Sequence, residues 1–150
     1  LLPKARFVHV VRDGRDVAAS LMARDWRGPD GRPFAHVCDP RAALKYWTDI
    51  AGIGLAAEAA LKDRCLRVSY ENLVRAPKRT LTTCLRFAGL DFDSGVFGDV
   101  ADSDFTALER DSLPLLLDRV VKTRMGAGKA LAGHVTDPVR ARLKELGYRV

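Results

Sequence analysis

The order of apolar and polar positions near the start of the chain predicts a strand that leads directly into a helix. The run from Phe7 to Val11 (FVHVV) is short, apolar and rich in β-branched residues, as in a buried strand. Beyond Asp13, apolar residues recur at helical spacing, which predicts a helix over residues 14–25 with Asp13 as its N-cap. Residues 26–39 are rich in glycine, proline and aspartate, so we expect a loop there.

The later segments continue this alternation of strands and helices. The predicted elements are a helix over 40–61 that starts at Asp39-Pro40, a strand over 65–69, a helix over 77–88 with Gly89 as its C-cap, and a helix over 137–147. This order predicts an α/β fold, a parallel sheet flanked by helices, in a single domain over residues 1–150. Ligands of such sheets bind beyond the C-terminal ends of the strands, where Arg12 and Tyr70 stand.

Composition narrows the class of protein. Of the 150 residues, 47% are apolar and 29% charged, which is ordinary for a globular domain. No apolar run approaches the roughly 18 residues of a membrane helix, so no membrane segment is expected. The three cysteines have no CxxC spacing, which argues against a zinc site and a disulfide framework. We therefore expect no metal, and buried, reduced thiols in a cytoplasmic protein.

Charge is unevenly distributed along the chain. The net charge is +6, but residues 91–118 carry −7 and separate two basic regions. Clustered positive charge attracts anionic partners. A nucleotide, a nucleic acid and an anionic polymer would all fit this pattern, and so would a solvated surface of mixed charge.

A candidate anion site follows from the spacing of three polar residues. Arg12 leaves the tip of the first strand, while Ser20 and Arg24 lie one turn apart on the helix that follows. Two guanidinium groups, a hydroxyl and a helix N-terminus suit a phosphate group. The alternative is structural, with Arg12 paired to Asp13 or Asp16 and Ser20 merely packed.

The stretch from Arg12 to Ser20 (RDGRDVAAS), with the strand before it, resembles the 3′-phosphate-binding strand–turn–helix of sulfotransferases. These enzymes use 3′-phosphoadenosine-5′-phosphosulfate (PAPS), and the resemblance implies that Arg12 and Ser20 hold the donor's 3′-phosphate. Arg24 matches a further arginine of the tyrosylprotein sulfotransferase branch. The resemblance also implies a P-loop-NTPase-like sulfotransferase fold with a nucleotide-binding site.

Two further segments resemble the same family. Residues 65–74 (CLRVSYENLV), followed by Pro77 and by residues 87–90 (FAGL), are similar to the family's RYEDLV–P–L–FLGL stretch. This similarity implies that Tyr70 packs near the adenine, since a Tyr ring is a flat surface on which a base can lie. The alternative is an interior Tyr with a satisfied hydroxyl.

The stretch RMGAGK, from Arg124 to Lys129, resembles the family's late glycine- and lysine-containing loop, which closes over the 3′-phosphate. The resemblance therefore adds Arg124, Gly126 and Lys129 to the cofactor-binding residues. The tryptophan that often follows the family's loop lysine is absent, because Ala130 stands there.

The family's 5′-phosphosulfate loop should precede the first strand, and no segment of this sequence matches it. We therefore expect the chain to be the C-terminal part of a longer domain. None of the three histidines matches the family's catalytic base, so the catalytic residues stay unassigned. The implied activity is that of a PAPS-dependent sulfotransferase that transfers a sulfuryl group to a hydroxyl or amine. The alternatives are an inactive fragment, a nucleotide- or polyanion-binding module, and a P-loop kinase-like phosphotransferase.

The sequence leaves the sulfate acceptor open. Acceptor pockets are built from loops, and the loops at 26–39 and 91–118 carry no pattern that names a substrate. A carbohydrate, a peptide and a small molecule all remain candidate acceptors. No nucleic-acid partner is expected.

Overall fold

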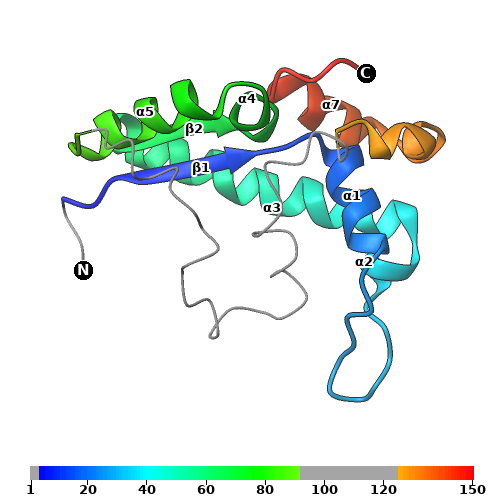
Figure 1. Cartoon of the computed structure of the whole chain (residues 1–150). Helices are drawn as coiled ribbons and strands as arrows, with labels where there is room; N and C mark the ends of the chain where they lie inside the picture. Colours follow the sequence, from blue (N-terminus) through cyan, green and yellow to red (C-terminus); the bar gives the residue numbers. More distant parts are fainter. Residues whose placement is uncertain (1–3, 92–124) are drawn as a thin grey trace, which may run out of the picture.

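The structure is a computed structural model that describes residues 4–91 and 125–150 and combines strands with helices (Figure 1). Its elements are β1 (Phe7–Val11), α1 (Gly14–Met22), α2 (Ala35–Cys38), α3 (Pro40–Leu61), the 3₁₀ helix η1 (Lys62–Arg64), β2 (Cys65–Ser69), α4 (Tyr70–Arg75), α5 (Pro77–Ala88), the 3₁₀ helix η5 (Ala127–His134) and α7 (Asp137–Glu145). The predicted α/β class is confirmed. The predicted loop segment 124–129 begins at Arg124, which lies outside the described residues, as do most of the acidic residues 91–118.

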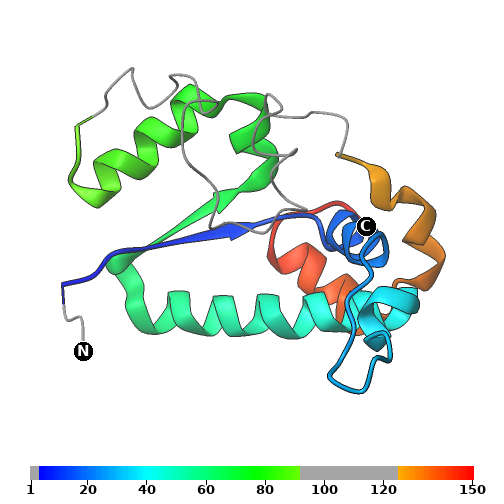
Figure 2. The ribbon, with the colours of Figure 1, turned by 60° about the horizontal axis from the view of Figure 1, so that its bottom comes forward.

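The two strands pair in parallel, as the sequence predicts. Phe7 lies opposite Cys65 and Val11 lies opposite Ser69 in the register. A parallel pair needs a crossover connection, and here the crossover contains α1, α2 and α3. The register brings the C-terminal ends of both strands to the same edge of the sheet. Figure 2 shows α3 along one side of the strands and α5 on the opposite side of β2.

Helix α3 has the length and the start that its sequence predicts. The Asp39 carboxylate accepts a hydrogen bond of 2.7 Å from the Ala42 amide, and Pro40 occupies the first helical turn. Leu44 and Trp47 are buried on its apolar face. Helices α1, α2 and α7 all pack against α3.

The core lies between α1, α3 and α7 rather than around the strands. Its buried members are Ala18, Ala43, Leu44, Trp47, Ala51, Val139 and Leu143. Trp47 lies directly under Gly14, where a Cβ atom would come within 2.3 Å of the indole ring. Gly14 therefore allows the first turn of α1 to rest on α3, which fixes the direction in which α1 leaves the strand.

The short helices α2, η1, α4 and η5 were not predicted, and the predicted helices α1 and α7 are shorter than expected, α7 ending at Glu145 instead of residue 147. Helix α1 ends at Met22 instead of residue 25, because the chain turns at Ala23 into a hairpin closed by a bridge between Arg27 and Pro33. The expected loop after it contains α2. Helix α4 begins directly at the end of β2, where the Ser69 hydroxyl caps it. The 3₁₀ helix η5 begins within the expected glycine-rich loop and continues beyond it to His134.

The cysteines differ from the expectation of buried thiols. All three are free, Cys38 is exposed, and Cys65 and Cys84 are only partly buried. Helix α5 likewise buries none of its residues fully, although its apolar positions follow a helical period. Among the described residues, no helix is both long enough and apolar enough to cross a membrane.

Candidate functional site

Arg12 and Tyr70 meet where the two strands end. Arg12 follows the last residue of β1, and Tyr70 follows the last residue of β2. Because the strands are in register at their ends, the Arg12 guanidinium carbon lies 4.5 Å from the centre of the Tyr70 ring. This is a cation–π contact, in which the ring fixes the direction of the guanidinium group.

Arg12, Ser20 and Arg24 line one pocket of about 280 Å³, which we call the α1 pocket. The pocket is lined by Arg12, Asp16, Ala19, Ser20, Ala23, Arg24 and Ala127. The convergence expected from their spacing is therefore present, because the two arginines and the serine border a common space. The small alanine side chains leave room between them.

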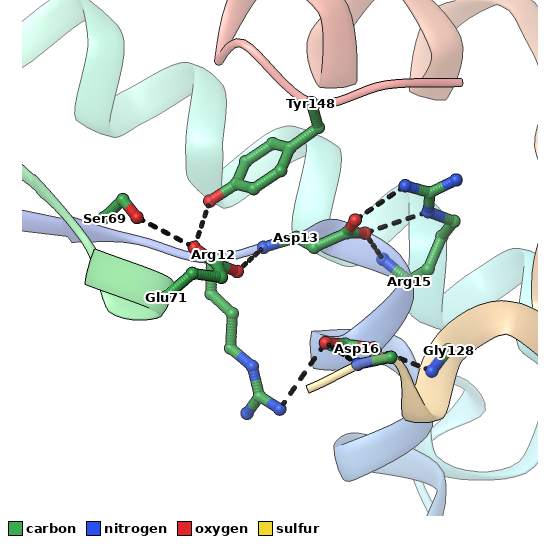
Figure 3. A network of polar contacts seen from close by, with 9 residues as sticks. Arg12, Asp13, Arg15, Asp16, Ser69, Glu71, Gly128 and Tyr148 are labelled. Atoms are coloured by element: carbon green, nitrogen blue, oxygen red, sulfur yellow. Dashed lines mark hydrogen bonds and ion pairs between the residues drawn. The ribbon is translucent and has the colours of Figure 1, made fainter. Parts of the chain in front are cut away.

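Asp16, the alternative partner of Arg12, also lies near it, at the longest distance that counts as an ion pair. The Arg12 Nη2 atom lies 4.0 Å from the Asp16 Oδ2 atom (Figure 3). The Asp16 oxygens are closer to the backbone of the glycine-rich segment. The Gly126 amide donates to Oδ2 at 2.8 Å, and the Gly128 amide donates to Oδ1 at 2.7 Å. Asp16 is buried and links α1 to a segment about 110 residues later in the chain.

Gly126 and Lys129 lie around a second and larger pocket of about 960 Å³, which we call the C-terminal pocket. It is lined by Asp13, Arg15 and Asp16, by Ser69, Glu71, Asn72 and Arg75, by Met125, Gly126, Gly128 and Lys129, and by residues 146–150. Asp16 borders both pockets. Of the glycine-rich segment, Ala127 is the residue that faces the α1 pocket. Arg124 lies outside the described residues.

Glu71 joins the ends of both strands to the C-terminal segment (Figure 3). Its Oε1 atom accepts a hydrogen bond from the Asp13 amide, and its Oε2 atom accepts from the hydroxyls of Ser69 and Tyr148, all at 3.0 Å. Burial, together with the charge of Glu71, raises the pKa of Tyr148 above its ordinary value. Sequence reasoning missed this role, although Glu71 belongs to the block that carried the second resemblance.

Asp13 caps α1 and holds Arg15 in place. Its carboxylate accepts from the Arg15 amide at 2.9 Å and from the guanidinium group of the same residue at 2.6 and 3.0 Å. These hydrogen bonds raise the pKa of Arg15. Arg15 also donates to the carbonyl of Arg149 at 2.8 Å, so the predicted N-cap anchors the end of the chain as well.

The histidines lie away from both pockets. The His9 Nδ1 atom is 2.5 Å from the Glu58 carboxylate of α3. His36 is stacked between Phe34 and Tyr46, with ring centroids 5.4 and 4.3 Å apart. None of the three histidines lines the α1 pocket or the C-terminal pocket, so no catalytic base is assigned.

The geometry agrees with a comparison to known protein families. A family model described as "Sulfotransferase family" matches residues 1–94. The matched part includes both strands, Tyr70 and the three predicted anion-binding residues of the α1 pocket, while the glycine-rich segment lies beyond it. Because the match spans well over half of the chain and contains the strand–turn–helix that builds the α1 pocket, the chain belongs to the sulfotransferase family.

Proposed function

We propose that the α1 pocket binds the 3′-phosphate of PAPS and that the chain takes part in transfer of a sulfuryl group to a hydroxyl or amine acceptor. One observation carries this proposal. Arg12, Ser20 and Arg24, which come from a strand end and two successive turns of α1, face the same pocket. The sulfotransferase family match supports the reaction class.

The donor set of the α1 pocket fits a phosphate group. Arginine presents a planar fork of N–H donors that matches phosphate oxygens, and the Ser20 hydroxyl adds a neutral donor. Two positive charges offset the charge of the anion. The Tyr70 ring beside Arg12 supplies the flat surface that we propose for the adenine.

When bound, PAPS supplies the activated sulfuryl group. The residues described here hold and orient rather than make or break bonds. Arg12 and Ser20 would fix one end of the donor. Because the donor then loses its translational and rotational freedom on binding, less entropy is lost in the transition state and the barrier to transfer is lower. Asp16 would act indirectly, because it holds the backbone of Gly126 and Gly128 beside the pocket.

The proposal is tested by the affinity of the chain for adenosine 3′,5′-bisphosphate, measured by isothermal titration calorimetry. Arg12→Ala removes a charge-assisted contact of about 1.5–3 kcal/mol, so Kd should rise roughly 10- to 150-fold. Arg41→Ala is the matched control, because Arg41 is an exposed arginine of α3 away from both pockets. Equal affinities of wild type and Arg12→Ala would contradict the assignment.

Ligand selectivity separates the proposal from its alternatives. The α1 pocket should prefer adenosine 3′,5′-bisphosphate to adenosine 5′-phosphate at least tenfold, because only the first carries the 3′-phosphate. Binding with a steep salt dependence and no preference between these nucleotides would favour a polyanion-binding module instead. Magnesium-dependent binding of ATP would favour the phosphotransferase.

A further inference from the structure

Cationic side chains outnumber carboxylates around the C-terminal pocket. Four cationic side chains border it: Arg15, Arg75, Lys129 and Arg149. Three carboxylates, those of Asp13, Asp16 and Glu71, border it as well. What the pocket offers to a ligand depends on which of these charges are already engaged within the protein.

The carboxylates of the pocket are engaged. Asp13 is held by Arg15, which cancels one positive charge against one negative charge. Both oxygens of Asp16 accept backbone amides of the glycine-rich segment. Both oxygens of Glu71 accept hydrogen bonds, two of them from hydroxyls. These three carboxylates therefore already accept hydrogen bonds within the protein.

The remaining cations have no partner in the part of the chain that the structure describes. The side chains of Arg75, Lys129 and Arg149 form no hydrogen bond or ion pair with the described residues. All three are exposed and come from different parts of the chain, namely α4, η5 and the C-terminal end. A single pocket thus gathers three positive charges on separate segments, none of them paired within residues 4–91 and 125–150, which is a receptive arrangement for an oxyanion.

The C-terminal pocket is distinct from the α1 pocket. The two share Asp16, and the glycine-rich segment stands between them, with Ala127 on one side and Lys129 on the other. None of Arg12, Ser20 and Arg24 lines the C-terminal pocket. An anion held by the three cations is therefore a different group from the 3′-phosphate that we assign to the α1 pocket.

We infer that the C-terminal pocket is a second anion subsite, which binds a sulfate or carboxylate group carried by the acceptor. The identity of the ligand as a sulfate acceptor rests on the proposed function, whereas the binding of an anion in this pocket does not. It narrows the substrate class to acceptors that already bear an oxyanion. Arginine at two of the three positions suits the paired oxygens of a sulfate or carboxylate group.

The first arm of the test titrates sodium sulfate into the ¹⁵N-labelled chain while adenosine 3′,5′-bisphosphate saturates the donor site. The backbone amides of Lys129 and Arg149 should shift on addition of sulfate. In the variant Arg75→Gln/Lys129→Gln/Arg149→Gln, the sulfate Kd should rise more than tenfold, since each contact contributes roughly threefold. The matched control Lys4→Gln/Arg41→Gln/Arg86→Gln removes the same charge from exposed sites outside the pocket and should bind sulfate like wild type.

The second arm distinguishes an acceptor-borne anion from a free one. A sulfated disaccharide should bind the C-terminal pocket at least fivefold more tightly than inorganic sulfate, and its unsulfated form should not bind. A disaccharide that binds no better than sulfate would overturn the acceptor assignment. Loss of the sulfate response when the bisphosphate is bound, or equal loss in both triple variants, would overturn the second subsite.

The inference and the proposed function fail separately. The double variant Arg75→Gln/Arg149→Gln, which leaves Lys129 in place, should keep its affinity for adenosine 3′,5′-bisphosphate within twofold, whereas Arg12→Ala should lose that affinity and keep the sulfate response. A chain that binds sulfate at Lys129 and Arg149 but shows no nucleotide affinity would refute the donor site alone.

Discussion

Gly128 shows how one small side chain controls the boundary between the two pockets. A Cβ atom at this position would come within 2.1 Å of the Arg15 carbonyl carbon and 2.3 Å of its oxygen. These are backbone atoms of α1, which cannot rotate away as a flexible side chain would. The close approach lets the Gly128 amide reach Asp16 at 2.7 Å. Glycine is thus needed at position 128 because it lets the segment approach the α1 backbone closely, and not because its backbone angles exclude other residues.

We expect Gly128→Ala to lower the free energy of unfolding by about 1–3 kcal/mol, the usual range for overpacking. The same change should weaken binding of adenosine 3′,5′-bisphosphate. Displacement of the glycine-rich segment would move Ala127, which lines the α1 pocket, and so change the shape of that pocket. Urea denaturation and calorimetry would measure the two effects. Gly133→Ala is the matched control in η5, since nothing lies within 4 Å of its Cβ position, and it should stay within about 0.5 kcal/mol of wild type. Equal stability of both variants would contradict this account.

The residues of the α1 pocket could be predicted because they belong to one strand–turn–helix. Helical geometry alone relates Arg12, Ser20 and Arg24, so their spacing was informative. The partners of Asp16 and Glu71 were not accessible in this way. Asp16 binds amides about 110 residues away, and Glu71 accepts a hydroxyl 77 residues away. Such pairs depend on how separate segments pack, which local spacing does not encode.

At the scale of elements, α3 connects the core to both strands. Its Glu58 carboxylate pairs with His9 of β1 and with Arg67 of β2. The hydrogen bonds from Arg67, followed by that from His9, lower the pKa of Glu58. By helix propensity, glycine at position 54 lowers the stability of this helix by about 1 kcal/mol relative to alanine. The structure supplies the reason for it, because the His9 ring occupies the space that a side chain would need.

Gly52 and Gly54 should therefore respond oppositely to alanine. At Gly54 the new Cβ atom would come within 2.3 Å of the His9 ring, which Glu58 holds in place, so we expect a net loss of about 1–2 kcal/mol of stability. At Gly52 it meets only the end of the Arg142 side chain at 2.9 Å, which can move aside. Gly52→Ala should therefore be neutral or stabilising by up to about 1 kcal/mol. Chemical denaturation of both variants checks the order, and the reverse order would show that His9 is not fixed.

Long elements with clear caps could be predicted, and short ones could not. Helix α3 combines an aspartate cap, a proline and a long apolar period, which all indicate the same boundaries. Helix α2 has only four residues and no side-chain cap, so packing on α3 decides it. Helix α4 was not predicted because Pro77 marks a later helix start. The non-helical backbone of Ala76 (φ −141°, ψ 64°) before this proline separates α4 from α5.

At the scale of the whole molecule, the C-terminal segment ties the beginning of the chain to its middle. Leu143 of α7 is fully buried against α3, and the residues beyond α7 return to the strand ends (Figure 1). Arg15 donates to the Arg149 carbonyl, and the Tyr148 hydroxyl donates to Glu71. The C-terminal pocket therefore exists only while this segment is in place, and a measurement on Tyr148 reports on its closure.

Tyr148 should make the stability of the molecule sensitive to alkaline pH. Burial and the nearby Glu71 charge raise its pKa in the folded state, whereas in the unfolded chain it titrates at the ordinary value of about 10. Above that pH the unfolded state loses a proton that the folded state retains. The stability contributed by the neutral hydroxyl is therefore complete below pH 10 and is lost as pH rises further.

Tyr148→Phe removes both the titrating group and its hydrogen bond to Glu71. We expect the variant to be about 1 kcal/mol less stable than wild type at pH 8 and to lose less stability than wild type between pH 9 and pH 11. Urea denaturation at a series of pH values gives both quantities. Tyr46→Phe is the control, because Tyr46 is 40% exposed and stacks through its ring, so its pH dependence should follow that of wild type. If Tyr148→Phe kept the wild-type loss of stability above pH 10, the hydroxyl would not be held against Glu71, and the C-terminal segment would not close the larger pocket as described.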